Sequence, residues 1–122
     1  MDGTLSPKES PRVRVEIGGA FGKYQRFDAI LDTGFTGGIS MPLAQALPLG
    51  LVLYSIATFV LADGSKEEAF LCLGNARIEG KEARIMVALS KGDDVLIGTE
   101  FLSTFRLTLE LDYEKNKFHL RG

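Results

Sequence analysis

Residues 29–37 read Ala-Ile-Leu-Asp-Thr-Gly-Phe-Thr-Gly, so an apolar run leads directly to one carboxylate, that of Asp32. Such a run is typical of a buried strand, and Asp32 marks the point at which this strand leaves the predicted core. Thr33 adds a hydroxyl group, and Gly34 permits close backbone approach and unusual dihedral angles. The tripeptide alone also fits an ordinary turn, so the surrounding chain must decide whether it is a chemical site.

The segments around this stretch predict short strands and close turns. Residues 12–17 alternate polar and apolar side chains, which is the pattern of a half-buried strand, and residues 24–31 read as its hairpin partner. Further strand-like segments follow at about 39–41, 51–61, 68–78, 83–89, 95–97, 107–111 and 117–120. Short helices are expected at about 43–47 and 99–102. The sum predicts an all-β, barrel-like domain.

Length and composition indicate one globular domain. The chain has 122 residues, which suits a single domain over 12–122, preceded by a polar, proline-containing segment that we expect to be a flexible leader over 1–11. The net charge of −2 provides no polybasic surface, so neither nucleic acid nor an anionic membrane is expected as a partner.

Cysteine and histidine usage argues against a disulfide or a metal centre. Cys72 is the single cysteine, which excludes a disulfide within the chain and fits a reducing compartment, so we expect a cytoplasmic location. Cys72 lies in an apolar strand, and His119, the single histidine, lies in a terminal strand, so both read as structural residues. The sequence contains no phosphate-binding loop, dinucleotide fingerprint or metal-ligand cluster, and we expect no cofactor.

The stretch over 34–62 contains no charged residue and is long enough to span a bilayer. Pro42 and Pro48 would break a single helix within this stretch. We therefore interpret it as a short helix, a turn and a strand, all buried in a soluble core, and expect no membrane span.

Two features distant in the sequence indicate that Asp-Thr-Gly is more than an ordinary turn. One is the apolar run Leu96-Ile97-Gly98, followed at once by the predicted helix, and the other is the turn Ala62-Asp63-Gly64-Ser65 between the two motifs. With these in place, the sequence resembles the retroviral-type (retropepsin-like) aspartic proteases from about Val13 to Leu111. It is most similar to the small cellular and microbial single-domain members. The stretches that carry the resemblance are residues 29–37, 61–65 and 95–102.

The resemblance implies a closed, barrel-like retropepsin fold and a role for each matching residue. Asp32 would be the catalytic aspartate, and Thr33 would bond to its copy across a dimer. Gly34 would line the substrate cleft, while Ile97 and Gly98 would support the active-site loop from beneath. A flap that closes over substrate would be formed by Ala62, Asp63, Gly64 and Ser65.

The resemblance also implies a homodimer. Peptide hydrolysis needs a base to activate water and an acid to protonate the product, and two close carboxyl groups sharing one proton supply both, as aspartic proteases illustrate. This chain has one Asp-Thr-Gly, so the second Asp32 must come from another copy. The expected function is an aspartic endopeptidase that cleaves peptides or unfolded proteins.

Two alternatives remain open at the level of sequence. A catalytically weak or inactive peptide-binding module could have the same fold, and a plain β-domain could match by chance. Retroviral enzymes usually carry an acidic residue where Thr36 stands and an arginine where Thr99 stands, and this salt-bridged pair is absent here as a whole. The dimer must therefore be held by other contacts.

Overall fold

The computed structural model describes residues 1–5, 10–60 and 63–122. Its strands are β1 (Asp2–Thr4), β2 (Arg12–Gly18), β3 (Tyr24–Leu31), β4 (Ile39–Pro42), β5 (Val52–Val60), β6 (Lys66–Ile78), β7 (Lys81–Ser90), β8 (Leu96–Ile97), β9 (Thr108–Asp112) and β10 (Lys117–Arg121). The helices are α1 (Leu43–Ala46), the 3₁₀ helix η1 (Leu47–Leu49) and α2 (Thr99–Thr104). The predicted all-β class with short helices is confirmed.

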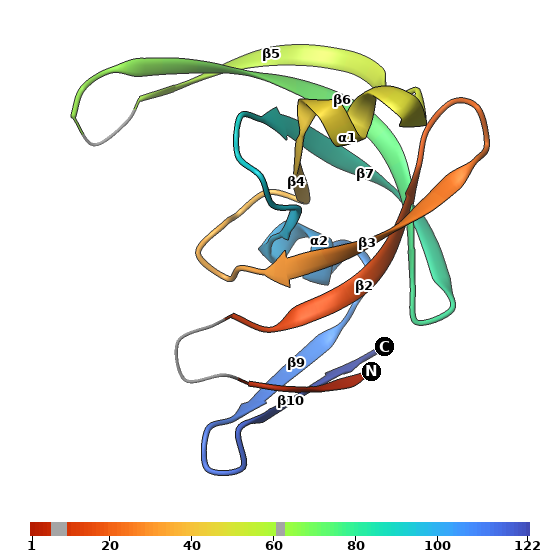
Figure 1. The fold of residues 1–122 in the computed structure, drawn as a ribbon, viewed down its shortest axis with the longest axis vertical. Helices are drawn as coiled ribbons and strands as arrows, with labels where there is room; N and C mark the ends of the chain where they lie inside the picture. Colours follow the sequence, from red (N-terminus) through yellow and green to blue (C-terminus); the bar gives the residue numbers. More distant parts are fainter. Residues whose placement is uncertain (6–9, 61–62) are drawn as a thin grey trace.

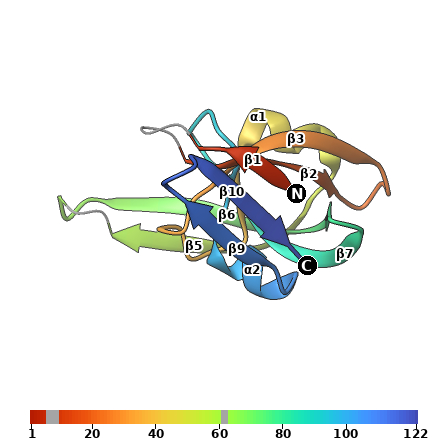
Figure 2. The ribbon, with the colours of Figure 1, turned by 90° about the horizontal axis from the view of Figure 1, so that it is seen from below.

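The strands form two sheets. Seven strands pair in the order β2-β3-β8-β4-β7-β6-β5, and the other three pair as β1-β10-β9 (Figure 1). Figure 2, a view from below, shows β1, β10 and β9 of the second sheet in front of the rest of the body. The hairpin of β5 and β6 projects away from them to the left. Alternation in β2 turns Val13, Val15 and Ile17 into the core, as the sequence pattern predicts.

The larger sheet closes only partly into a ring of strands. Besides its pairing with β3, strand β2 pairs with β6 at Glu16↔Arg77, Ile17↔Ala76 and Gly18↔Asn75. Strand β5 lies outside this ring and pairs, within the described chain, only with β6. The fold is therefore barrel-like, and the closed barrel expected from the resemblance is not clearly formed.

The N-terminal residues belong to the second sheet. Strand β1 pairs antiparallel with β10 at Asp2↔His119, Gly3↔Phe118 and Thr4↔Lys117. The flexible leader predicted over 1–11 therefore contains an ordered strand, because the pairing partner lies at the far end of the chain, where a local pattern cannot show it. Residues 6–9 of that segment lie outside the described residues, and the domain boundary at residue 12 remains a prediction.

The prediction that residues 34–62 are entirely buried is wrong. Leu47 is 70% exposed, Tyr54 66% and Ile56 56%, whereas Ala46 and Leu49 turn into the core. The reason is position: α1 and η1 bury only one side, and β5 is an edge strand that extends beyond the body (Figure 1). Among the described residues, no helix is long and apolar enough to cross a membrane.

Candidate functional site

Asp32 lies where two parallel strands end. Strands β3 and β8 pair in parallel through Ile30↔Leu96 and Leu31↔Ile97, and the Asp32 backbone N–H donates to the carbonyl oxygen of Ile97 at 2.9 Å. Leu31 and Ile97 are buried in the core, whereas Asp32 is only half-buried. The two strands thus carry the Asp32 carboxylate from the core to the surface, and the bond to Ile97 fixes the backbone at Asp32.

The loop after Asp32 orients its carboxylate. The N–H of Gly34 donates to Asp32 Oδ1 at 2.9 Å, and the N–H of Phe35 donates to the Asp32 carbonyl at 3.1 Å. A methyl group built on Gly34 would lie 3.2 Å from the same Oδ1, so glycine gives the carboxylate room. Thr33 and Gly34 are exposed, so this part of the loop is accessible at the surface.

Gly98 lies directly beneath this loop. A methyl group on Gly98 would stand 2.3 Å from the carbonyl oxygen of Gly37 and 2.4 Å from that of Phe35, so no side chain fits there. The N–H of Gly98 donates to the Gly38 carbonyl at 2.9 Å, and the N–H of Thr99 donates to the Phe35 carbonyl at 2.9 Å. The fold thus brings Ile97 and Gly98 together with the loop between β3 and β4, residues 32–38, which we call the Asp32 loop. The two segments are far apart in the sequence.

Three of the four predicted flap residues are described, and they lie at the end of the β5–β6 hairpin. Asp63, Gly64 and Ser65 are exposed there, and Gly64 has a φ of +85°, which favours glycine. Ala62 lies outside the described residues. Figure 1 shows the hairpin projecting toward the same side of the body as the loop that follows β3.

Hydrogen bonds within the turn act on one carboxyl group. Ser65 donates to Asp63 Oδ1 through its hydroxyl at 2.5 Å and its N–H at 2.9 Å, and these bonds, the hydroxyl first, lower the pKa of the Asp63 carboxyl below its ordinary value. A lowered pKa means that the ionised carboxyl supports the turn above its ordinary pKa, and that this support is lost as the pH falls through the folded-state pKa.

The substitution Ser65→Ala removes the hydroxyl bond and leaves the backbone bond in place. We expect the pKa of Asp63 to rise toward its ordinary value, which a carboxyl-carbon NMR titration measures directly. An unchanged pKa would contradict the role given to the Ser65 hydroxyl.

Two apolar residues of the hairpin were not singled out by the sequence. Ile56 and Phe70 are directly opposite in the β5–β6 register and are 56% and 46% exposed. Phe70 is two residues from the buried Cys72 on β6, so both residues extend the core-facing side of the sheet beyond the core. The alternation over 68–78 indicates which side of the strand Phe70 lies on. It does not show that the strand extends beyond the rest of the fold, which leaves this side exposed there.

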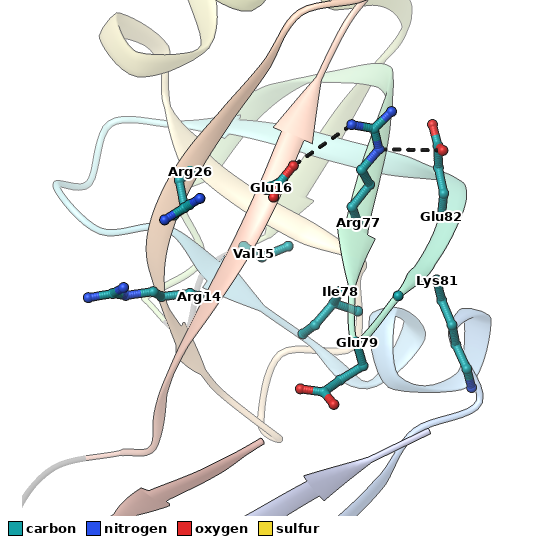
Figure 3. Close-up of a pocket in the computed structure, with 10 residues that line it drawn as sticks. Arg14, Val15, Glu16, Arg26, Arg77, Ile78, Glu79, Lys81 and Glu82 are labelled. Atoms are coloured by element: carbon teal, nitrogen blue, oxygen red, sulfur yellow. Dashed lines mark ion pairs between the residues drawn. The ribbon is translucent and has the colours of Figure 1, made fainter.

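A surface hollow of about 410 Å³ lies away from these residues, against β2, β3, β6 and β7 (Figure 3). Arg77 bridges Glu16 and Glu82 there, with N···O distances of 3.9 and 3.4 Å. The Tyr24 hydroxyl donates to Glu82, which raises the pKa of Tyr24 and lowers that of Glu82. These side chains are solvent-accessible, so the pairs contribute little stability. The residues that line the hollow, all from the described chain, do not include Asp32 or its neighbours.

Cys72 and His119 have structural surroundings. Burial raises the pKa of the Cys72 thiol, which disfavours its reactive thiolate form. His119 Nδ1 lies 2.6 Å from Asp2 Oδ1 in the terminal sheet, and this contact lowers the pKa of Asp2. Within the described ranges, no group of three or more His, Cys, Asp or Glu side chains could hold a metal ion.

Comparison with known proteins identifies the fold. No family model matches the sequence, and no curated protein matches it either. The EIAV protease, solved in complex with an inhibitor, superposes with a TM-score of 0.65 at 17% identity, covering 89% of this chain and 100% of the protease. The simian foamy virus protease gives a TM-score of 0.58 at 16% identity, covering 76% and 92%. The chain therefore has the retropepsin-like fold.

Proposed function

We propose that this chain is an aspartic endopeptidase that acts as a homodimer, with one Asp32 from each copy in a shared active site. The observation that carries the proposal is the setting of Asp32. Its half-buried carboxylate is oriented by the Gly34 N–H, held on the Ile97 carbonyl through its own backbone, and placed within a fold shared with retroviral proteases. The aspartic protease activity of those proteins is transferred here as part of the proposal.

The proposed reaction uses the two carboxyl groups as base and acid. The ionised Asp32 removes a proton from water, whose oxygen attacks the peptide carbonyl carbon, while the protonated Asp32 donates its proton to the carbonyl oxygen. As the resulting diol breaks down and the C–N bond cleaves, one diol hydroxyl gives its proton to the ionised carboxylate, and the amine nitrogen takes the proton of the other carboxyl group. In the proposed dimer the two Asp32 carboxyl groups would lie close together and share one proton, because like charges that near cannot both ionise readily.

The homodimer follows from having one Asp32 per chain. A two-fold axis through the site would make the contact isologous, with Asp32 and the exposed Thr33 facing their own copies. In this arrangement Ala62, Asp63, Gly64 and Ser65 act as the flap. Ile56 and Phe70 support a substrate with apolar side chains near the cut bond, because they offer exposed apolar surface on the hairpin.

A peptide-binding module with little turnover is the second candidate. It is favoured by one observation: the exposed Thr36 and Thr99 cannot form the acid–arginine bridge that usually lies near the dimer interface in retroviral enzymes. In this case the surface around Asp32 and the β5–β6 hairpin would hold peptides without a firmly assembled Asp32 pair.

Digestion of a peptide library separates the two candidates. We expect the wild-type protein to cleave peptides at acid to near-neutral pH, with a preference for apolar residues beside the cut bond, as read by mass spectrometry of the products. Sedimentation of the same sample reports whether it is dimeric. A dimer that cleaves no peptide across this pH range would favour the binding module, and a preference for charged flanking residues would contradict the apolar assignment.

A further inference from the structure

The loop that follows Asp32 has Thr36 and Thr99 at the positions where retroviral enzymes usually carry a salt bridge. It is nevertheless joined closely to the start of α2. Three backbone hydrogen bonds join the two segments: Asp32 N–H to Ile97, Gly98 N–H to Gly38, and Thr99 N–H to Phe35. Such bonds fix the register of the two segments, and a side chain placed over the junction can restrict the remaining motion of the loop.

The side chain at that junction is Phe35. Its Cδ2 would lie 2.7 Å from a methyl group on Gly98, and its Cζ would lie 2.6 Å from a methyl group on Gly37. The ring therefore rests on the bare Cα faces of two glycines, one in the Asp32 loop and one at the end of β8. Its backbone is bonded to Asp32 through the N–H and to Thr99 through the carbonyl, so one residue links all parts of the junction.

We infer that Phe35 is a positioning residue, which holds the Asp32 loop in register by packing its ring between Gly37 and Gly98. Phe35 precedes Thr36 in the sequence, and its carbonyl accepts the Thr99 N–H, so this apolar contact lies beside the two positions at which retroviral enzymes usually carry an ion pair. Its consequence for catalysis rests on the proposed function. Phe35 restricts the loop that aims the Asp32 carboxylate, without itself touching the reacting atoms.

The replacement Phe35→Ala tests this role. We expect kcat to fall about 10–100-fold with KM changed about twofold or less, because misplacement of a reacting group lowers the rate more than it lowers binding. Phe35→Leu retains apolar volume and should recover part of kcat. Phe21→Ala removes the same ring from a side chain that is 72% exposed in the β2–β3 turn, and it should leave kcat unchanged.

A double-mutant cycle tests the ring–glycine contact itself. Gly37→Ala pushes a methyl group into the Phe35 ring, so it should lower kcat in the wild-type background. The same change should have little further effect after Phe35→Ala, because the space is then free. Equal, additive effects in the two backgrounds would overturn the inference.

Amide hydrogen exchange gives a readout that does not depend on activity. Phe35→Ala should speed exchange at the Gly98 and Thr99 amides by about tenfold while the amides of β2 keep their protection. Absence of cleavage by wild type would refute the proposed function, and the exchange comparison would still decide the role of Phe35. Unchanged exchange at both amides would overturn the positioning role whatever the activity.

Discussion

Replacing Asp32 with asparagine is expected to abolish peptide cleavage while leaving the fold and the dimer in place. Asparagine has nearly the same shape, and its amide oxygen can still accept the Gly34 N–H bond that Asp32 Oδ1 accepts at 2.9 Å. It cannot take or give the proton that the reaction needs. General acid–base catalysis contributes up to about 10⁴-fold to the rate, so we expect a loss of that order in kcat.

A matched control is available on the preceding strand. Asp28 has an exposed carboxylate that pairs with Arg12 at 3.5 Å, and Asp28→Asn removes the same charge four residues earlier in the sequence. We expect this variant to retain wild-type cleavage. Retained cleavage in Asp32→Asn would refute Asp32 as the catalytic group, and equal loss in both variants would attribute the effect to charge rather than to chemistry.

The second large effect is expected from Gly98→Ala. The added methyl group would meet two backbone carbonyl oxygens at 2.3 and 2.4 Å, and neither can swing away as a flexible side chain could. Since overpacking typically costs about 1–3 kcal/mol, we expect the free energy of unfolding to fall by that amount. Relief of the contact would move the Asp32 loop, so cleavage should also fall by at least about 100-fold.

Urea unfolding and peptide cleavage measured on the same samples test this expectation. Gly92→Ala is the control, because its methyl group would meet nothing closer than Ser90 Oγ at 3.7 Å, an ordinary contact. We expect that variant to be unchanged in stability and activity. A Gly98→Ala protein with wild-type stability and activity would show that the close approach of the Asp32 loop to Gly98 is not required.

The strands that lead to Asp32 could be predicted from the sequence because their patterns are local. Alternation over 12–17 correctly predicted β2, and the apolar run before Asp32 correctly predicted the end of β3. The link between Leu96-Ile97-Gly98 and the Asp-Thr-Gly motif is implied by the resemblance to retropepsin-like proteases, in which these motifs follow in the same order. The structure adds the reason for that pairing, which is the parallel contact of Leu31 with Ile97.

Features that depend on distant contacts could not be predicted. Strand β1 forms against β10, at the opposite end of the chain, so the first residues looked like a leader. Exposure of Leu47 and Tyr54 depends on which elements lie at the edge of the fold, which hydrophobicity alone does not report. The packing of Phe35 on Gly37 and Gly98 similarly requires two distant segments to meet in space.

The central claim, that two chains share one site, is tested most directly by mixing wild-type protein with Asp32→Asn protein under conditions in which dimers exchange. Random pairing at equal amounts leaves about one quarter of the dimers with two Asp32 carboxyl groups. Activity relative to the same total of wild-type protein should therefore fall to about one quarter. A fall to about one half would mean that each chain works alone and would contradict the shared Asp32 pair.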